Sequence, residues 1–393
     1  MNNILDVPFK DMCCSCGVCV GGCPKQCISL EFDKNKCGKP VPVVDSSLCV
    51  ECGFCKKICG GYNKLQYELF TPISEKLKAQ KGNYLELKVG NINKQEYLDK
   101  STSGGICTGL ICELLRQKIY DVAFGVVSSN FSNIVATEQL LDENSVLDSA
   151  KSKYVSVSHE NAIRYINENR ESRVILVGTS CALESIRLFI EQKKLNRSNY
   201  LLIGLFCDKS MTYQIWNYYA SKYSDLKEMY FRSKDGGGWP GSFCIRVNEE
   251  NILLNKKERM RFKDYFCHER CLYCTDKLNM NADISLGDNY TGKNDSIFGT
   301  SSIIIRSFQG KAAFEFIRKD CALYEIDMET IARSQELGKK KENGIFSQIK
   351  FGSEKQTSIR MYIKYCYKRL KIWSGYYAIK YPWIMKLLQA IKS

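Results

Sequence analysis

Apolar runs alternate with amphipathic segments along most of the chain, and this alternation predicts an α/β fold. Continuous apolar or alternating stretches predict strands, whereas apolar residues spaced three and four apart predict helices. The predicted strands lie at 84–92, 121–127, 173–179, 200–207, 282–288 and 301–307. Helices are predicted after the turn at 101–105 and after position 181. In such sheets, ligands gather at the carboxyl ends of the strands.

The first 62 residues have a different pattern. Short alternating segments at 27–32 and 41–45 predict two small strands among cysteine-rich loops. A polar, charged stretch that contains Pro72 predicts a linker. We therefore expect an α+β chain overall, whose parts are a small domain at 1–62, a linker at 63–82, a mixed α/β domain at 83–310 and a helical C-terminal region at 311–393.

Composition limits the class of protein. With 393 residues, 44% of them hydrophobic, the chain can bury a sizeable core and form two or three domains. Its 21 cysteines would suggest disulfides in a secreted protein, but the N-terminus MNNILDVPFK has no apolar signal segment. We therefore expect a protein of the reducing cytoplasm, where cysteines are free to bind metal.

The charge balance is strongly positive. The formal net charge is +14 at pH 7. Such an excess suits an anionic cofactor, an acidic redox partner or an anionic membrane surface. Nucleic acid is not expected as a partner, because no basic stripe accompanies a nucleic-acid-binding motif.

Two cysteine runs near the start have the spacing of cubane iron-sulfur ligands. The runs are Cys13-x2-Cys16-x2-Cys19-x3-Cys23-Pro24 and Cys49-x2-Cys52-x2-Cys55-x3-Cys59. Three thiolates spaced in this way can bind one cube, and loop N–H groups stabilise the negative sulfurs. In two-cluster ferredoxins, the last cysteine of each run binds the other cluster. The predicted ligand sets are therefore Cys13, Cys16, Cys19 and Cys59, and Cys49, Cys52, Cys55 and Cys23.

Zinc is the alternative for these runs. Structural zinc takes four thiolates, usually from two well-separated pairs, and two identical runs of four cysteines fit that arrangement poorly. Gly60 stands where the second run would be expected to end in proline. Cys14, Cys27 and Cys37 fall outside the pattern, and we expect each to be a small buried hydrophobic group.

A third group of cysteines lies in the second half of the chain. Cys271 and Cys274 form a CxxC pair that Cys267 precedes, and these provide at most three thiolates. Cys181 and Cys207 each stand at the carboxyl end of a predicted strand. We favour a third cluster bound by Cys181, Cys207, Cys271 and Cys274; buried packing cysteines are the alternative.

The turn Ser101-Thr102-Ser103-Gly104-Gly105 has two interpretations. It precedes a predicted helix, where free N–H groups and the helix dipole favour an anion such as phosphate. Two glycines would let that anion approach the backbone closely. A helix cap without any ligand fits the same residues equally well.

The order of several motifs resembles the coenzyme F420 hydrogenase/dehydrogenase beta-subunit family, joined to an N-terminal two-cluster ferredoxin. The motifs are NINKQEYLDKSTSGG, SKYVSV at 152–157, GTSCALESIRL at 178–188, GLFCDKS, CLYC and ADISLGDNY. The resemblance covers nearly the whole chain and implies an α/β domain that binds FAD and a four-iron cluster. Ser180, Ala182 and Asp208 depart from the residues that are usual in members.

The resemblance also implies residue roles. The expected FAD phosphate ligands are Ser103, Gly104, Gly105 and Thr108, and the residues expected beside the cofactor are Lys153, Tyr154 and Thr179. Asp288 and Tyr154 are candidates to orient a substrate or supply a proton, on the strength of their position alone.

The expected function is that of an iron-sulfur flavoprotein oxidoreductase. Single electrons from a ferredoxin-type donor, such as a small acidic ferredoxin, would pass through four-iron clusters to FAD and on to a small organic substrate or a deazaflavin. Clusters transfer one electron and flavin can transfer two. Some family members accompany bacterial surface-polysaccharide synthesis. The alternative is an electron-relay beta subunit without its own substrate, as in coenzyme F420 reduction.

The C-terminal segment from Arg360 mixes aromatic and aliphatic residues with lysine and arginine. Lys371, Lys380 and Lys386 interrupt its apolar runs before the ~18 residues that a membrane span requires. The segment fits either peripheral contact with an anionic membrane or a helix pair packed on its own domain.

Overall fold

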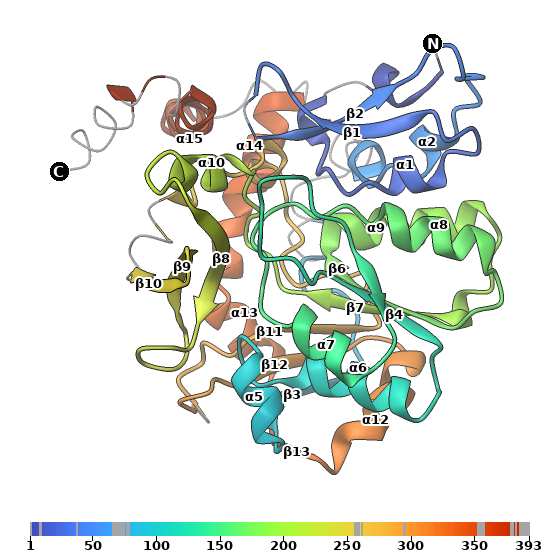
Figure 1. The fold of residues 1–393 in the computed structure, drawn as a ribbon, viewed down its shortest axis with the longest axis vertical. Coiled ribbons are helices and arrows are strands. Elements are labelled where there is room, and N and C mark those ends of the chain that lie inside the picture. The colour runs from blue at the N-terminus through green and yellow to red at the C-terminus, as the bar shows by residue number, and fades with distance from the viewer. Residues whose placement is uncertain are drawn as a thin grey trace.

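A computed structural model describes residues 2–7, 10–36, 38–64, 75, 79–254, 260, 262–293, 296–351, 358–377, 381 and 383–384. The described elements include an eight-stranded sheet, a three-stranded sheet and a small N-terminal hairpin (Figure 1). Most of the segment expected to be a linker, 65–74 and 76–78, lies outside the described residues, as does Cys37.

The large sheet has the strand order β13-β3-β12-β11-β7-β6-β4-β5. Its strands are β3 (Glu86–Ile92), β4 (Val122–Gly125), β5 (Glu138–Leu140), β6 (Val174–Thr179), β7 (Tyr200–Leu205), β11 (Ile284–Asp288), β12 (Ser301–Ile305) and β13 (Cys321–Glu325). Six of these strands were predicted from the apolar pattern, and the mixed α/β class is confirmed.

Strand direction determines where functional residues meet. Strands β4, β6, β7 and β11 are parallel neighbours. Strand β3 runs in the same direction, because β12 is antiparallel to both β11 and β3. The carboxyl ends of all five strands therefore lie at one edge of the sheet, where doubly wound folds bind their ligands.

Helices cover both faces of the large sheet (Figure 1). They include α5 (Gln95–Lys100), α6 (Ile106–Arg116), α7 (Glu143–Ser149), α8 (Glu160–Glu168), α9 (Ser180–Gln192), α12 (Phe308–Arg318) and α13 (Met328–Ser334). On one face, Leu110 of α6 and Phe314 of α12 share a buried cluster with strand residues. On the other, Ile163 of α8 and Phe189 of α9 pack on β6 and β7.

The N-terminal unit packs directly on α8 and α9. Its elements are η1 (Ile4–Asp6), η2 (Lys10–Met12), α1 (Val18–Gly22), β1 (Ile28–Phe32), β2 (Pro40–Val44) and α2 (Phe54–Lys57). Val18 and Ile58 belong to the same buried cluster as Ile163 and Phe189. The N–H of His159 donates to the carbonyl oxygen of Cys16 at 2.8 Å. The cysteine runs are thus held against the α/β domain.

The three-stranded sheet was not predicted from the sequence. It consists of β8 (Leu226–Ser233), β9 (Ser242–Val247) and β10 (Glu250–Leu254), all antiparallel, and packs with α10 (Gln214–Ala220). Its core is unusually aromatic and includes Phe231, Phe243 and Trp216. These rings stack across strands rather than along a simple apolar run, so periodicity alone did not reveal the sheet.

The C-terminal region is not purely helical. Strand β13 pairs with β3 at the edge of the large sheet, so the sheet extends past the boundary expected at 310. After it come η5 (Leu337–Lys339), α14 (Lys340–Phe351) and α15 (Ile359–Tyr377). Tyr365 and Ile372 of α15 are buried against Tyr273 and Phe346, as expected of a helix that packs on its own domain. None of the helices in the described segments is long and apolar enough to cross a membrane.

Candidate iron-sulfur and cofactor site

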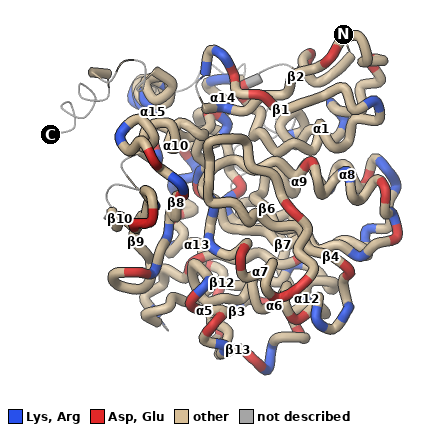
Figure 2. The backbone as a smooth tube through the Cα atoms, viewed as in Figure 1, with Lys and Arg blue, Asp and Glu red and all other residues tan. Residues whose placement is uncertain are grey.

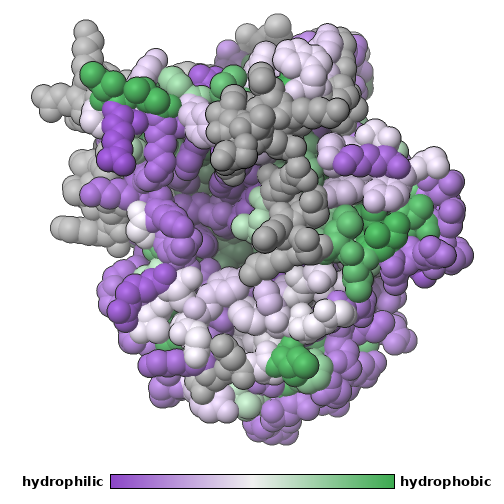
Figure 3. All heavy atoms as spheres, turned by 90° about the vertical axis from the view of Figure 1, so that its left-hand side faces the viewer, coloured by the Kyte–Doolittle hydropathy of each residue, from purple (hydrophilic) through white to green (hydrophobic). Residues whose placement is uncertain are grey.

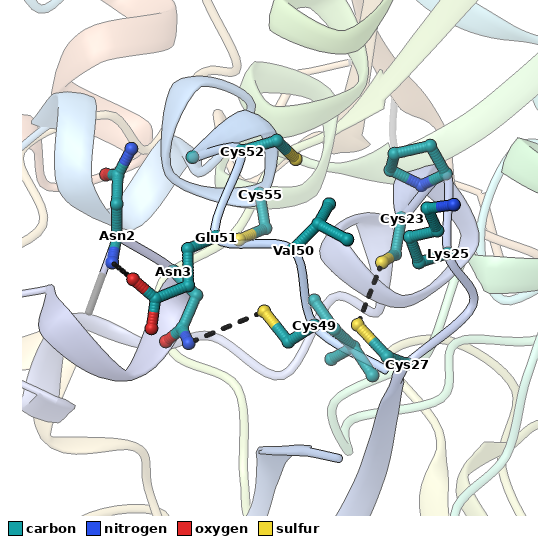
Figure 4. A pocket seen from close by; sticks show the side chains of 13 residues that line it. Asn2, Asn3, Cys23, Lys25, Cys27, Cys49, Val50, Glu51, Cys52 and Cys55 are labelled. Atoms are coloured by element: carbon teal, nitrogen blue, oxygen red, sulfur yellow. Dashed lines mark hydrogen bonds between the residues drawn. The ribbon is translucent and has the colours of Figure 1, made fainter. Parts of the chain in front are cut away.

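One of the two N-terminal ligand sets lines a pocket (Figure 4). The cysteines around this pocket are Cys23, Cys27, Cys49, Cys52 and Cys55. The Sγ atoms of Cys23 and Cys27 are 3.4 Å apart, and Asn3 Nδ2 donates to Cys49 Sγ at 3.7 Å. The predicted exchange of Cys23 into the second run is compatible with this pocket. Cys27, expected to be a packing residue, is buried and also lines this pocket, directly before β1.

The two runs repeat the same backbone bends. Ser15 and Glu51 have φ values of 59° and 54°, and Gly17 and Gly53 have 68° and 71°. Non-glycine residues rarely adopt positive φ, so the paired occurrence indicates two equivalent, constrained loops. Such bends turn successive N–H groups inward, and the N–H of Ser15 donates to the Sγ of Cys13 at 3.4 Å. The loops are therefore preorganised to stabilise negative sulfur.

The other N-terminal set lies against α9. Burial raises the pKa of the Cys19 thiol, and the neighbouring charges of Cys13 and Cys59 raise it further. The N–H of Tyr62 donates to the Sγ of Cys59 at 3.4 Å. Cys16 Sγ donates to the hydroxyl of Ser185 in α9 at 3.5 Å. All four predicted members therefore lie in one half-buried region, and Cys19 also interacts with Cys55 of the pocket set.

The glycine that replaces the expected second proline has a structural reason. The N–H of Gly60 donates to Ser185 Oγ at 2.9 Å, and proline has no such N–H. A Cβ atom at position 60 would lie only 2.8 Å from that oxygen. Docking of the second run on α9 therefore requires glycine here.

The four cysteines predicted for a third cluster also meet. Burial raises the pKa of Cys207, and the charges of Cys271, Cys181 and Cys274 act on it in the same direction. Cys181 lies in the first turn of α9 after β6, and Cys207 follows β7. Cys271 lies in η4 (Glu269–Leu272), and Cys274 follows it. The N–H of Ser210 donates to Cys271 Sγ at 3.5 Å. Sheet topology brings these distant segments to one edge.

Helix α14 covers this third set. Asn343 Nδ2 donates to the carbonyl oxygens of Cys271 and Cys274 at 3.1 and 2.8 Å. Lys340 is buried, and its Nζ donates to the carbonyl oxygen of Asp208 at 2.8 Å. Burial opposes the charge of Lys340, but nearby thiolates and Asp208 raise its pKa. The lysine therefore places a positive charge beside sulfur, a contact that the sequence pattern did not reveal.

Two further residues connect the first and third sets. Cys14 interacts through hydrogen bonds with both Cys16 and Cys181. The bond with Cys16 and burial raise the pKa of Cys14 well above its usual value, although the bond with Cys181 lowers it. Arg270 is buried and donates from Nη1 to the carbonyl oxygen of Met12 at 2.9 Å. Neither residue was singled out from the sequence as part of a site.

The Ser-Thr-Ser-Gly-Gly turn lies at the same sheet edge. Ser103 Oγ donates to the carbonyl oxygen of Thr300 at 2.7 Å, and a Cβ atom at Gly104 would lie 2.6 Å from the carbonyl oxygen of Gly90. Gly105 caps α6 with a φ of 73°. Thr108 Oγ1 lies 3.0 Å from Ser101 Oγ. The glycines are thus required for close packing of the turn on β3 and β12.

Several cations surround this turn. Lys234 Nζ donates to the carbonyl oxygens of Ser103, at 3.2 Å, and Leu98. Lys153 Nζ donates to the carbonyl oxygen of Ala150 at 2.7 Å. Burial lowers the pKa of Lys153 to about 8, assisted by the charge of Lys151, and burial likewise lowers the pKa of Lys234 to about 8. The turn therefore lies in a basic environment.

Asp288, at the end of β11, is the centre of a hydrogen-bond network. Arg232 of β8 donates to its two oxygens at 2.7 and 3.0 Å, and Trp239 Nε1 donates to Oδ1 at 2.8 Å. Tyr290 adds a hydrogen bond of 3.1 Å. Burial opposes ionisation, but the charge of Arg232 and these hydrogen bonds hold the pKa of Asp288 below its usual value. Arg232 also donates to the hydroxyl of Tyr154 at 3.3 Å.

The two predicted catalytic side chains are therefore joined through Arg232. Arg232 and Trp239 were not identified from the sequence, because both belong to the small antiparallel sheet and its turn, which the apolar periodicity did not reveal. The glycine-rich segment 236–241 is the one local pattern that could have drawn attention to this turn. Thr179, expected beside a cofactor, lies at the third cysteine set, where its hydroxyl is 3.3 Å from Cys181 Sγ. The roles of these residues stay predictions.

The surface around this edge is polar. The face of the molecule that carries β8, β9 and β10 is hollowed near its middle, with hydrophilic side chains around the hollow (Figure 3). Lys and Arg are interspersed with Asp and Glu along most elements, including β8 (Figure 2). The positive excess is thus dispersed over the described chain.

The fold and the grouped thiols define a cysteine-rich α/β protein. Two models of the coenzyme F420 hydrogenase/dehydrogenase beta subunit match it, the N-terminal one over residues 88–164 and the C-terminal one over 171–330. Together they take in more than half of the chain. The chain belongs to the coenzyme F420 hydrogenase/dehydrogenase beta-subunit family, and is thus related to oxidoreductases.

Individual relatives are more distant. A coenzyme F420-dependent sulfite reductase from Methanocaldococcus jannaschii is 25% identical over 356 residues, 86% of this chain and 50% of the reductase. The chain therefore spans about half the length of that relative. An uncharacterized protein of the same organism is 22% identical over 361 residues, 84% of this chain and 94% of that protein.

The fold is also similar to that of a solved structure. A chain in the F420-reducing NiFe hydrogenase complex from Methanosarcina barkeri matches with a TM-score of 0.51 and 17% sequence identity. The match covers 69% of this chain and 94% of that chain. At this identity the likeness concerns the fold.

Proposed function

We propose that this chain is an iron-sulfur flavoprotein oxidoreductase. Electrons enter at two clusters bound by the N-terminal runs, pass a third cluster bound by Cys181, Cys207, Cys271 and Cys274, and reach FAD at the Ser-Thr-Ser-Gly-Gly turn. The reduced flavin then reduces a small organic substrate. The clusters supply one-electron steps and the flavin collects two electrons, so the protein must keep them close and in order.

The observation that carries this proposal is the continuity of the three thiol sets. Cys55 of the pocket set interacts with Cys19 of the next set. Cys14, which follows Cys13 directly, interacts with Cys181 of the third set. A series of neighbouring thiols therefore runs from the N-terminal pocket to the carboxyl edge of the large sheet. A linear order of clusters is the arrangement that electron transfer requires.

The spacing of the cysteines along the chain favours clusters over zinc. A tetrahedral zinc ion with Zn–S bonds of about 2.3 Å draws its ligands close around one point. Within the described residues, no three side chains of His, Cys, Asp or Glu converge on a single ion in this way. A cubane cluster holds its thiolates farther apart than a single ion does, and the sequence spacing of the two N-terminal runs is that of cubane ligands.

The flavin end of the path is an anion-binding edge. The N-terminus of α6 and the half-buried Lys153 and Lys234 provide positive charge beside the glycine turn. Ser103, Gly104, Gly105 and Thr108 would bind the FAD phosphates, because small residues and N–H groups allow a phosphate to approach. Asp288, kept ionised by Arg232, would orient the substrate rather than donate a proton.

A direct test is the composition of protein purified without oxygen. Iron, acid-labile sulfide and extracted flavin are counted per chain, and the ultraviolet-visible spectrum is recorded. About twelve irons and one FAD are expected, as three four-iron clusters require. Zinc without sulfide would contradict the cluster proposal, and about eight irons without flavin would leave only the N-terminal clusters.

The electron donor that we propose is a small acidic ferredoxin. The positive net charge would attract such a donor and increase the association rate. Stopped-flow reduction should become slower as ionic strength rises, because salt screens the attraction. A rate that is independent of salt would contradict this choice of donor.

An electron-relay subunit is the second candidate function. The fold likeness to a chain of a hydrogenase complex favours it. Reduced protein is mixed without oxygen with coenzyme F420, and F420 absorbance is followed. Rapid F420 reduction would favour the relay and identify a deazaflavin as the acceptor. No reaction with F420, together with turnover of an organic acceptor, would favour the self-contained reductase. A role in surface-polysaccharide synthesis stays a prediction.

Helix α15 supports the proposal of peripheral membrane contact at the cytoplasmic surface. Ile359, Ile363, Leu370 and Trp373 lie on one side of the helix, and each is about half exposed or more. The helix lies at the periphery of the fold (Figure 1). The protein should sediment with vesicles rich in anionic lipid, and Trp373→Glu should reduce this binding. Absence of binding at low salt would contradict the proposal.

A further inference from the structure

Arg270 is a buried cation that has no acidic partner in the part of the chain that the structure describes. The residue is 5% exposed, and among the described residues no Asp or Glu forms an ion pair with it. Its Nη1 donates to the carbonyl oxygen of Met12, which is a neutral acceptor. A buried charge is unfavourable unless other charges compensate for it. The site must therefore contain another source of negative charge.

The position of the guanidinium indicates that the negative charge comes from the cysteine sulfurs of the first and third sets. Met12 directly precedes Cys13 of the first set, and a Cβ atom at Gly61 would lie 3.2 Å from Nη1, just beyond Cys59. Arg270 itself directly precedes Cys271 of the third set. The side chain thus reaches from the backbone of the third set to the backbone of the first.

The electrostatics agree with this geometry. Burial opposes the charge of Arg270, and nearby cysteine thiolates, such as a bound cluster would keep, favour that charge. The thiolates that act on it most strongly are Cys14, Cys181, Cys274 and Cys59. Two belong to the N-terminal unit and two to the α/β domain. No cysteine of the pocket set is among these four.

We propose that Arg270 raises the reduction potentials of the clusters bound by the first and third sets, and so supports electron transfer between them. The inference rests on the proposed function. In each transfer, one cluster loses one electron and the other gains it. No proton is transferred, and no covalent bond forms or breaks. A fixed positive charge stabilises whichever cluster carries the added negative charge. Arg270 is a positioning residue, since its charge acts on the electron carriers without itself changing.

The pocket set provides an internal comparison. Its cluster would be bound by Cys49, Cys52, Cys55 and Cys23, which are absent from the thiolates that interact most strongly with Arg270. Screening with distance makes the effect of one charge local. Removal of the guanidinium should therefore shift two reduction potentials and leave the third nearly unchanged.

The test uses the full chain with its clusters assembled without oxygen. Arg270→Gln and Arg270→Lys are compared with Arg318→Gln, a matched control whose arginine pairs with Glu86 at 2.8 Å near the opposite edge of the sheet. Iron is counted first, and each cluster is then titrated potentiometrically and followed by electron paramagnetic resonance.

The expected result has three parts. Arg270→Gln should shift the reduction equilibria of two clusters toward the oxidised state by about tenfold or more, which is about 59 mV for one electron. Arg270→Lys should shift them much less, because it keeps the charge. Arg318→Gln should shift none. Unchanged potentials in Arg270→Gln, or equal shifts in all three clusters, would overturn the inference.

Loss of clusters in a variant would also be decisive. If Arg270→Gln lacks iron whereas Arg270→Lys retains it, the positive charge is needed to hold the clusters, in agreement with the inference. If both variants lose the same iron, the arginine is required for its shape, and the inference fails. If the unaltered protein itself contains no iron and sulfide, the proposed function fails instead, so the two failures are distinguishable.

Discussion

The N-terminal runs and the third cysteine set both gather thiols, but they do so by different means. In the runs, short spacing and repeated positive-φ bends at Ser15 and Glu51 curl each loop around its own sulfurs. In the third set, Cys181 and Cys207 are brought to the CxxC pair only by the parallel pairing of β6 and β7. The first kind of site is local in sequence, and the second depends on the whole sheet.

The largest expected effect comes from removing one ligand of each kind. Cys274→Ser should remove about four of about twelve irons and lower the stability of the α/β domain, because η4 and α14 pack around that cluster. Cys52→Ser should also remove about four irons, with little change in the unfolding of the α/β domain, since Cys52 is exposed. Iron analysis and thermal unfolding of the purified variants measure both effects.

Cys366→Ser is the control for this comparison, because Cys366 is an exposed thiol on α15 outside all three sets. It should retain full iron content. Equal destabilisation by Cys52→Ser and Cys274→Ser would show that the two kinds of site do not differ in their dependence on the fold.

The second prediction concerns Asp288. Asp288→Asn leaves the buried Arg232 without its counter-charge, and breaking a buried ion pair in this way costs about 3–5 kcal/mol of unfolding free energy. Asp121→Asn breaks the exposed pair with Arg173 and should cost about 0–1 kcal/mol. Urea unfolding measures both. Similar losses in the two variants would contradict a special role of the Asp288 network.

The third prediction is a pH dependence of flavin binding. Lys153 and Lys234 have pKa values lowered to about 8, so each is mostly charged at pH 7 and mostly neutral at pH 9. Loss of a charged hydrogen bond costs about 1.5 kcal/mol, so the affinity for FAD should fall about tenfold or more as pH rises over this range. Fluorescence titration measures it. Riboflavin, which has no phosphate, should show no such trend.

The smallest expected effect is at the pocket set. Because Cys27 lies 3.4 Å from Cys23, it can replace Cys23 as the fourth ligand after a small movement. Cys23→Ser should therefore keep nearly all of its iron, whereas Cys23→Ser combined with Cys27→Ser should lose about four irons. If the single variant loses as much iron as the double variant, Cys27 is only a packing residue.

Most of the large sheet could be predicted, because its strands are buried on both faces and appear as continuous apolar runs. The small sheet could not, since its core depends on cross-strand contacts among rings such as Phe231 and Phe243. The cysteine groups were visible from spacing. Arg232, Lys340 and Arg270 were not, because no local pattern shows which buried cation faces which anion.

Local spacing by itself determined the two cysteine runs, the glycine turn and the positions of six strands, since each of these depends on neighbours in sequence. Only the tertiary structure decided that Cys14 meets Cys181, that Arg270 connects two thiol sets, and that Asp288 is held ionised by Arg232. The physical reason is the distance along the chain over which each interaction acts. Backbone preferences act over a few residues, whereas the electrostatics of a buried charge depend on every segment that the fold packs around it.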